Sequence, residues 1–402
     1  MTAMPQLDLA GPQGHAEMSI PHHGTKIFLC GDVMTGRGID QILPHPSDPR
    51  LYESAMDSAV DYVRLAEMEN GPIARPTSFS YVWGAALDEL SRRKPDARII
   101  NLETSITRSE AYVPKGINYR MSPENAECLS AAGIDCCMLA NNHVLDWSQA
   151  GLLETLDTLA RLKVKTAGAG RDLAEAKAPA VLGLGGKARL LVFAFASITS
   201  GVPRDWAARP HAPGINLLQD LTLHSAACVA EEVAKVKQTH DIIVASIHWG
   251  SNWGYDIPDD QRRFAHELVD KAGLSILYGH SSHHAKGMEI YRNRLILYGC
   301  GDFLNDYEGI RGYEVFRADL ALMYFADIDV TSGDLLDLEM VPLQIRRFRL
   351  ERASVEDVAW LAEVLDRESR RFATQIDVRP DGMLVAQSRG AATPPSAPIV
   401  RS

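Results

Sequence analysis

Residues 274–284 read Leu-Ser-Ile-Leu-Tyr-Gly-His-Ser-Ser-His-His, and this stretch contains the pattern that decides the fold. The apolar run at 274–278 has the length and composition of a buried β-strand. Three imidazoles follow it, at His280, His283 and His284. Neutral imidazole binds Zn, Fe, Ni and Cu, and carboxylates from elsewhere in the chain would extend the choice to Mn. An isolated histidine pair fits a solvated polar loop equally well, so the rest of the chain has to distinguish a metal site from such a loop.

Other predicted strands also end in potential metal ligands. The strands expected at 25–30, 97–103, 135–139 and 241–247 end at or just before Asp32, Glu103, Asn142-His143 and His248. In open α/β sheets the carboxyl ends of parallel strands meet at one edge, so ligands far apart in sequence can converge there. One bridging carboxylate with a few His, Asp and Asn ligands can hold two divalent ions about 3.5–4 Å apart. Taken alone, Asp32 is also compatible with a simple helix cap.

Strands alternate with helical patterns over most of the length, and paired strands come late in the chain. This order predicts an α/β architecture with layered sheets in one domain, residues 25–390. The expected helices include 149–162, 217–237, 259–272 and 354–371, and the expected late strands include 320–329 and 335–350. A helix could also open at Ser122, with Pro123 in its first position. Residues 1–24 and 391–402 are expected to be disordered tails.

Composition narrows the function classes. The 402 residues carry a formal net charge of -11, which makes nucleic acid and anionic membranes poor partners. No signal-peptide core and no run of about 18 apolar residues occurs, so we expect no membrane span. Six cysteines in so long a chain do not form a disulfide framework, and we interpret them as reduced thiols of a cytoplasmic protein. The oligomeric state does not follow from the sequence.

Five motifs in this order resemble the CapA family, the poly-γ-glutamate capsule synthesis proteins. They are Gly31-Asp32-Val33-Met34, Asn101-Leu102-Glu103, Asn141-Asn142-His143, His248-Trp249-Gly250 and Gly279-His280-x-x-His283. The resemblance covers residues 25–350. It implies a branch of the calcineurin-like metallophosphoesterases, whose fold is a two-sheet α/β sandwich flanked by helices. It also implies a dinuclear centre of divalent metal ions such as Mn, Zn or Fe.

The resemblance assigns a role to each residue of the motifs. Asp32 would bind one metal ion with His283, Glu103 would bridge, and Asn142, His248 and His280 would bind the other ion. His143 would be the acid that protonates a leaving group, and Asp146 could orient its ring. A general acid needs a free imidazole near pH 7, which suits a histidine that is not a ligand.

The chain also departs from the family pattern. Most metallophosphoesterases have a histidine at the position of Met34, so one ion could be weakly bound or absent. Whether His283 or His284 is the ligand stays open, because Ser281-Ser282 alters the usual spacing. Asp302 could add a ligand or cap a turn, and we expect the turn. Founding family members are membrane-anchored and act on an extracellular polymer. We expect no anchor in this chain, so a capsule role does not transfer with the fold.

Three functions fit this site. The first is a metal-dependent hydrolase that uses metal-activated water on a phosphoester or a γ-glutamyl-type amide, linked to poly-γ-glutamate metabolism. The substrate would be a small or peptide-like anion, held by Arg37 and the Lys115/Arg120 loop, with Trp249 and Trp253 lining the pocket. The second is a peptide or amino-acid epimerase that uses His143 at Cα. The third is a non-catalytic carrier or scaffold for an anionic polymer.

Overall fold

The first strand, β1 (Gly24–Cys30), runs through the middle of the larger sheet because its second half is apolar on both faces. Ile27, Phe28, Leu29 and Cys30 are all fully buried. The computed structural model describes residues 24–186 and 188–389. The disordered tails expected at 1–24 and 391–402 lie outside these residues, except Gly24, which begins β1.

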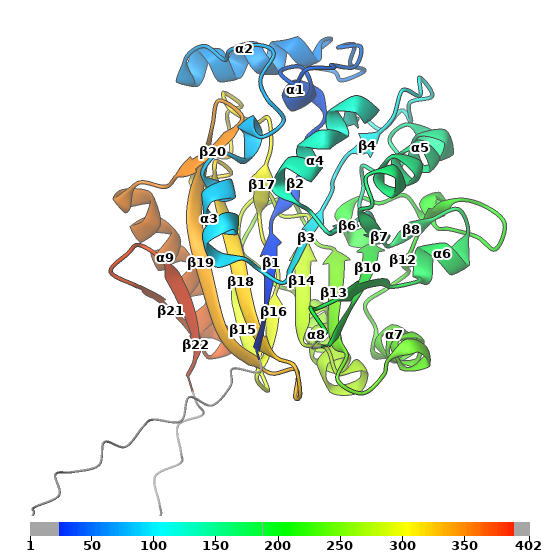
Figure 1. Cartoon of the computed structure of the whole chain (residues 1–402), viewed down its shortest axis with the longest axis vertical. Helices are drawn as coiled ribbons and strands as arrows, with labels where there is room; N and C mark the ends of the chain where they lie inside the picture. The colour runs from blue at the N-terminus through cyan, green and yellow to red at the C-terminus, as the bar shows by residue number, and fades with distance from the viewer. Residues whose placement is uncertain (1–23, 187, 390–402) are drawn as a thin grey trace, which may run out of the picture.

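Two large sheets share the main hydrophobic core (Figure 1). The larger has the order β21 (Thr374–Val378), β22 (Leu384–Ser388), β19 (Leu335–Arg346), β18 (Leu320–Asp329), β1, β3 (Ala97–Asn101), β6 (Cys136–Met138) and β7 (Lys165–Ala167), with β20 (Arg349–Arg352) on β19. The second has the order β12 (Leu217–Leu218), β10 (Arg189–Ser197), β13 (Ile242–His248), β14 (Ile276–His280), β16 (Arg294–Leu297) and β15 (Met288–Tyr291), with β9 (Ala180–Gly183) on β10.

Helices cover these sheets, and short paired strands connect them. The helices are α1 (Arg37–Asp40), α2 (Ala59–Asn70), α3 (Ala85–Arg93), α4 (Glu127–Ala132), α5 (Ser148–Arg161), α6 (Leu173–Lys177), α7 (Leu223–Val236), α8 (Asp259–Ala272) and α9 (Val355–Ser369). The short strands pair as β2 (Asp32–Val33) with β17 (Asp302–Leu304), β4 (Ser105–Ile106) with β5 (Arg120–Met121), and β8 (Ala169–Gly170) with β11 (Gly214–Ile215).

The central strands of the second sheet, β10, β13 and β14, are buried on both faces. Along β10, Leu190, Val192 and Ala194 belong to the core shared with the larger sheet, whereas Leu191 and Phe193 pack in a second cluster. That second cluster also contains the apolar faces of α7 and α8. The alternation follows from the period of two in a strand. The chain therefore has the predicted α/β class, a calcineurin-like two-sheet sandwich flanked by helices.

Two expected elements differ from the structure. The helix expected at 217–237 begins only at Leu223, because Thr222 caps it through its side chain and Leu217–Leu218 pairs with β10 instead. The strand expected at 335–350 is two strands, β19 and β20. Arg347 and Phe348 turn the chain between them with φ of 55° and 56°. The segment after Ser122 is a 3-10 helix, Pro123–Ala126, and the α-helix α4 follows it.

The parallel strands bring the predicted ligands to one edge. β1, β3 and β6 are parallel neighbours, and so are β13 and β14 in the other sheet. The two edges meet where β2 pairs with β17, so that Asp32 and Asp302 lie opposite each other. Gly31 makes this approach possible, since its backbone passes directly against Gly301.

Two expectations from composition concern the described residues, namely the absence of a membrane span and the absence of a disulfide framework. Among these residues, none of the helices is both long and apolar enough to cross a bilayer. All six cysteines are free thiols, five of them buried and Cys228 exposed.

We expect Gly31→Ala to destabilise the protein by about 1–3 kcal/mol or more, as overpacking does when backbone has to move. An added Cβ would lie 2.2 Å from the Gly301 carbonyl oxygen, which no side-chain rotation can relieve. Gly183→Ala is the matched control, because nothing lies within 4 Å of its Cβ. Urea unfolding of both variants measures the difference, and equal stabilities would contradict the close packing at Gly31.

Candidate metal centre

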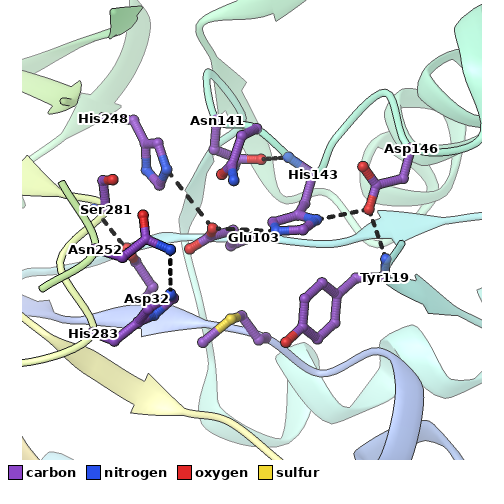
Figure 2. Close-up of polar contacts among 12 residues, drawn as sticks. Asp32, Glu103, Tyr119, Asn141, His143, Asp146, His248, Asn252, Ser281 and His283 are labelled. Atoms are coloured by element: carbon purple, nitrogen blue, oxygen red, sulfur yellow. Dashed lines mark hydrogen bonds and ion pairs between the residues drawn. The ribbon is translucent and has the colours of Figure 1, made fainter. Parts of the chain in front are cut away.

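Asp32, Glu103 and His248 form the centre of the site. Ligand atoms of these three residues all lie within 4.8 Å of one another, and each side chain is almost completely buried. His280 joins them from β14, with its Nδ1 atom 2.5 Å from Asp32 Oδ1. Asn101 also donates to this oxygen, at 2.8 Å. The cluster therefore draws on strand ends of both sheets (Figure 2).

The buried carboxylates are electrostatically unfavourable without a cation. Burial raises the pKa of Glu103 well above its usual value, and the nearby Asp32 raises it further. Burial would also raise the pKa of Asp32, but His280, His248 and Glu103 together outweigh it, and the net shift is downward. Removing carboxylates from water costs several kcal/mol each unless opposite charge is provided. The pair is therefore suited to a bound cation.

Four of the predicted ligands have a buried atom with no hydrogen-bond partner among residues 24–186 and 188–389. These atoms are Glu103 Oε2, Asn142 Oδ1, His248 Nδ1 and His280 Nε2. Buried polar atoms are almost always paired, so unpartnered atoms on four of the six predicted ligands require an explanation. Carboxylate, amide and imidazole atoms are a donor set that suits Zn, Mn or Fe. The residues present fit a divalent metal ion.

His143 lies beside this cluster and is held by Asp146. Its Nδ1 atom is 2.7 Å from Asp146 Oδ2, which also accepts a hydrogen bond from the backbone N–H of Tyr119 at 2.6 Å. Its Nε2 atom lies 3.8 Å from Glu103 Oε1 (Figure 2). Burial lowers the pKa of His143 to about 4, although Asp146 acts in the opposite direction. The ring thus presents Nε2 to the metal cluster.

Lys115 completes a chain of charged groups behind His143. Its ammonium nitrogen is 2.8 Å from Asp146 Oδ1 and 3.3 Å from His143 Nδ1. The lysine lies in the loop after β4 and reaches the site across the face of Trp206, 5.3 Å from the ring centroid. Asp146 therefore contacts both His143 and Lys115.

A cavity of about 250 Å³ opens beside these residues. Its wall contains ligand candidates, polar side chains and a few apolar ones, namely Glu103, Lys115, Ile117, Tyr119, Asn142, His143, Gly201, Pro203, His248, Asn252, Ser281, His283 and Tyr307. Lys115 is the single cationic side chain among these lining residues. The cavity is large enough for a small anionic group next to the metal cluster.

His283 and His284 point to different surroundings. His283 lines the cavity, with Nδ1 3.0 Å from Asp302 Oδ1 and Nε2 3.0 Å from the Asn252 amide. His284 packs against Phe316, with ring centroids 4.7 Å apart, and burial lowers its pKa to about 4. The geometry favours His283 as the residue that could reach a metal ion.

The comparison with known families agrees with this geometry. The family model described as bacterial capsule synthesis protein PGA_cap matches residues 26–307. The chain belongs to this family. It is the CapA-type family of the metallophosphoesterase-like superfamily, as the ordered motifs at the strand ends suggested.

Relatives of the family extend over most of the chain. A probable polyglutamine synthesis accessory protein of Mycobacterium tuberculosis is 46% identical over 360 residues, which cover 89% of this chain and 94% of that protein. The PGA biosynthesis protein CapA of Bacillus subtilis is 26% identical and covers 69% of this chain and 62% of its own length. The capsule biosynthesis protein CapA of Bacillus anthracis is 24% identical, with 79% and 67% covered.

The two arginines predicted to hold substrate are engaged elsewhere. Arg37 is 3% exposed and donates to both oxygens of Asp306 and to Glu53. Arg120 pairs with Glu110 and stacks over the Trp147 ring at 4.0 Å. Neither lines the 250 Å³ cavity, so their positions do not support substrate binding there.

The two tryptophans predicted to line the pocket also lie outside the cavity wall. Trp249 is 2% exposed, donates to the Tyr298 carbonyl at 3.0 Å and packs against Phe264 in the core. Trp253 stacks on Tyr313 with ring centroids 4.1 Å apart, and its ring lies 5.2 Å from that of His283, which lines the cavity. The tyrosines at 119 and 307 form the aromatic wall instead.

Two contributors, Asn101 and Asn252, were not assigned a role from the sequence, and Asp302 was expected to cap a turn rather than to contact a histidine. Asn101 donates to Asp32 and accepts from Asn141, so it fixes the first ligand and the asparagine loop together. Asn252 lies within the loop after β13 and contacts His283. Asp302, expected to cap a turn, pairs with His283 from β17. Asn101 lies in one of the five motifs, so a role at the site could have been considered from the sequence. The contacts of Asn252 and Asp302 with His283 follow only from the tertiary structure.

We expect Glu103→Gln to abolish metal-induced stabilisation while leaving the metal-free protein at least as stable as the wild type. The amide removes a carboxylate whose raised pKa shows that its charge is unfavourable without a cation. For the wild type, free Mn²⁺ or Zn²⁺ at 100 times its Kd should add about 2.7 kcal/mol. Thermal unfolding in EDTA and in metal measures both quantities. A variant that keeps the full metal-induced shift would contradict a ligand role for Glu103.

Proposed function

We propose that this protein is a metal-dependent hydrolase of phosphoester or γ-glutamyl-type amide bonds. The observation that carries the proposal is the buried cluster of Asp32, Glu103 and His248, together with the unpartnered buried atoms on four of the predicted ligands. Family membership agrees with it, since the superfamily is built around such centres. The names of relatives refer to polyglutamine synthesis, PGA biosynthesis and capsule biosynthesis. We therefore expect the substrate to come from poly-γ-glutamate or capsule-type metabolism.

We assign two divalent ions, Mn, Zn or Fe, to the centre. Asp32 and His283 would hold the first ion, Glu103 would bridge, and Asn142, His248 and His280 would hold the second. Bound there, the ions would act as Lewis acids that polarise the substrate's phosphoryl or carbonyl oxygen and lower the pKa of water. The strands keep these ligands in place, because every one of them lies at or just after the end of a buried strand.

His143 is the residue that we assign to proton transfer. Asp146 holds Nδ1, so the imidazole turns Nε2 towards Glu103 and the cavity. The ring would pass a proton through Nε2 to the leaving oxygen or nitrogen as the scissile bond breaks. Burial lowers the pKa of His143 to about 4, and Asp146 would stabilise the cationic ring that carries this proton against that effect. The Tyr119 backbone N–H and Lys115 hold the Asp146 carboxylate in this orientation.

Lys115 is the residue that we assign to the negative charge of the substrate. Of the residues that the sequence suggested for this role, Arg37 and the Lys115/Arg120 loop, Lys115 is the one whose side chain belongs to the cavity wall. Tyr119 and Tyr307, whose hydroxyl oxygens are 3.2 Å apart, close one side. An anionic group between Lys115 and the cations would be held near His143, which agrees with the small anionic substrate that we expect.

The alternative functions use the same site and differ in outcome. An epimerase would use His143 and a second base at Cα and would return a product of opposite chirality without bond cleavage. A scaffold would bind an anionic polymer without any turnover. Chiral chromatography of the products and a binding assay with poly-γ-glutamate therefore separate them from a hydrolase.

We expect His143→Ala to lower kcat by about 10²–10⁴-fold, which is the usual contribution of a positioned acid or base. The assay screens metal-loaded protein against p-nitrophenyl phosphate, bis-p-nitrophenyl phosphate and γ-glutamyl peptides. Metal content should stay at the wild-type level, because His143 is not assigned as a ligand. His211→Ala, which changes an exposed histidine, is the matched control and should keep full activity.

Full activity of the His143 variant would exclude the proton-transfer role. A wild-type protein that binds neither Mn²⁺ nor Zn²⁺ and hydrolyses none of these substrates would overturn the proposed function as a whole.

A further inference from the structure

We infer that Asp302 is a positioning carboxylate that orients His283 and thereby determines whether the first metal position fills. The inference rests on the proposed metal-dependent function. It goes beyond that function because Asp302 is not among the assigned ligands. It also replaces the expectation that Asp302 only caps a turn.

Asp302 is placed for this role by the meeting of the two sheets. It begins β17, which runs parallel to β2, and it lies opposite Asp32 in that pairing. Its side chain is completely buried. Burial raises the pKa of Asp302, although the neighbouring His283 acts in the opposite direction. A buried carboxylate costs stability unless it has a function or a strong partner.

Both oxygens of Asp302 have a partner. Oδ1 lies 3.0 Å from His283 Nδ1, and Oδ2 accepts a hydrogen bond from Asn305 Nδ2 at 2.8 Å. Asn305 is itself held, because its Nδ2 also donates to the Ala318 carbonyl at 3.1 Å. The carboxylate is therefore fixed behind the histidine and does not line the cavity.

This contact determines which nitrogen of His283 is free. With Nδ1 bonded to the carboxylate, Nε2 faces the cavity and meets the Asn252 amide at 3.0 Å. A carboxylate on one imidazole nitrogen with a metal ion on the other is the usual arrangement of a metal-binding histidine. Asn252 is on an exposed loop, so its amide can move aside when a cation arrives.

Binding of the first metal ion should depend on His283 more than binding of the second ion depends on any one of its ligands. Met34 is fully buried and contacts the Tyr307 hydroxyl through sulfur, at 3.7 Å. A thioether is a poor ligand for Mn and other hard cations. The second position has three neutral donors with unpartnered atoms, those of Asn142, His248 and His280. Loss of orientation at His283 should therefore empty the first position selectively.

The test measures metal binding in the intact chain. Wild type, Asp302→Asn and Glu308→Gln are stripped with EDTA, and Mn²⁺ binding is followed by equilibrium dialysis with elemental analysis. Glu308→Gln is the matched control, because Glu308 is a mostly buried carboxylate of the same segment that bonds the backbone at Arg347 and Phe348. We expect two equivalents for the wild type and the control. Asp302→Asn should bind the first ion 10–100-fold more weakly.

Electron paramagnetic resonance gives a second readout, since two neighbouring Mn²⁺ ions produce a coupled spectrum and a single ion does not. His283→Ala should match Asp302→Asn, and the double variant should lose no more than either single one, because both act on the same ligand. Thermal unfolding in EDTA checks that every variant folds.

Three outcomes are distinguishable. A wild type that binds neither Mn²⁺ nor Zn²⁺ and hydrolyses none of the screened substrates overturns the proposed function. A wild type with two ions and an Asp302→Asn variant with two ions of equal affinity overturns the inference alone. Additive losses in the double variant would show that Asp302 acts independently of His283 and would also overturn it.

Discussion

The contact between Asp32 and His280 joins the two sheets at the site on which the proposed function depends. Asp32 follows β1 of the larger sheet, His280 ends β14 of the second sheet, and their nearest atoms are 2.5 Å apart. Two residues before His280, the Tyr278 hydroxyl forms hydrogen bonds with the backbone of Cys30 and so joins β14 to β1. Any shift of one sheet against the other would separate the ligands. The packing of the shared core therefore sets the geometry of the metal centre.

This arrangement places stability and function in opposition. Asp32, Glu103 and Asp302 are buried within one region, and burial raises the pKa of the latter two. A protein optimised only for stability would replace such groups with neutral ones. Their presence, together with unpartnered imidazole and amide atoms, is consistent with a site whose energy is balanced by bound cations.

Two sets of charged groups near the site have different surroundings. Arg37, Asp306 and Glu53 form a closed, buried set of ion pairs that supports the loop after β2. Lys115, Asp146 and His143 form an open set that reaches the cavity. Residue type alone does not distinguish the two sets, since both contain a cation and a carboxylate next to aromatic rings. Of these two sets, only the open one contributes residues to the wall of the 250 Å³ cavity.

The sequence by itself determined the strand ends and the chemistry found there. Apolar runs of strand length followed by Asp32, Glu103 or His248 are local patterns, and parallel strands must bring their carboxyl ends together. Tertiary structure alone decided which charged side chains pair with each other and which remain at the cavity. Arg37 pairs with Asp306, 269 positions away, and His283 pairs with Asp302 only because β17 lies against β2. Such pairs depend on how the sheets stack, which local periodicity does not encode.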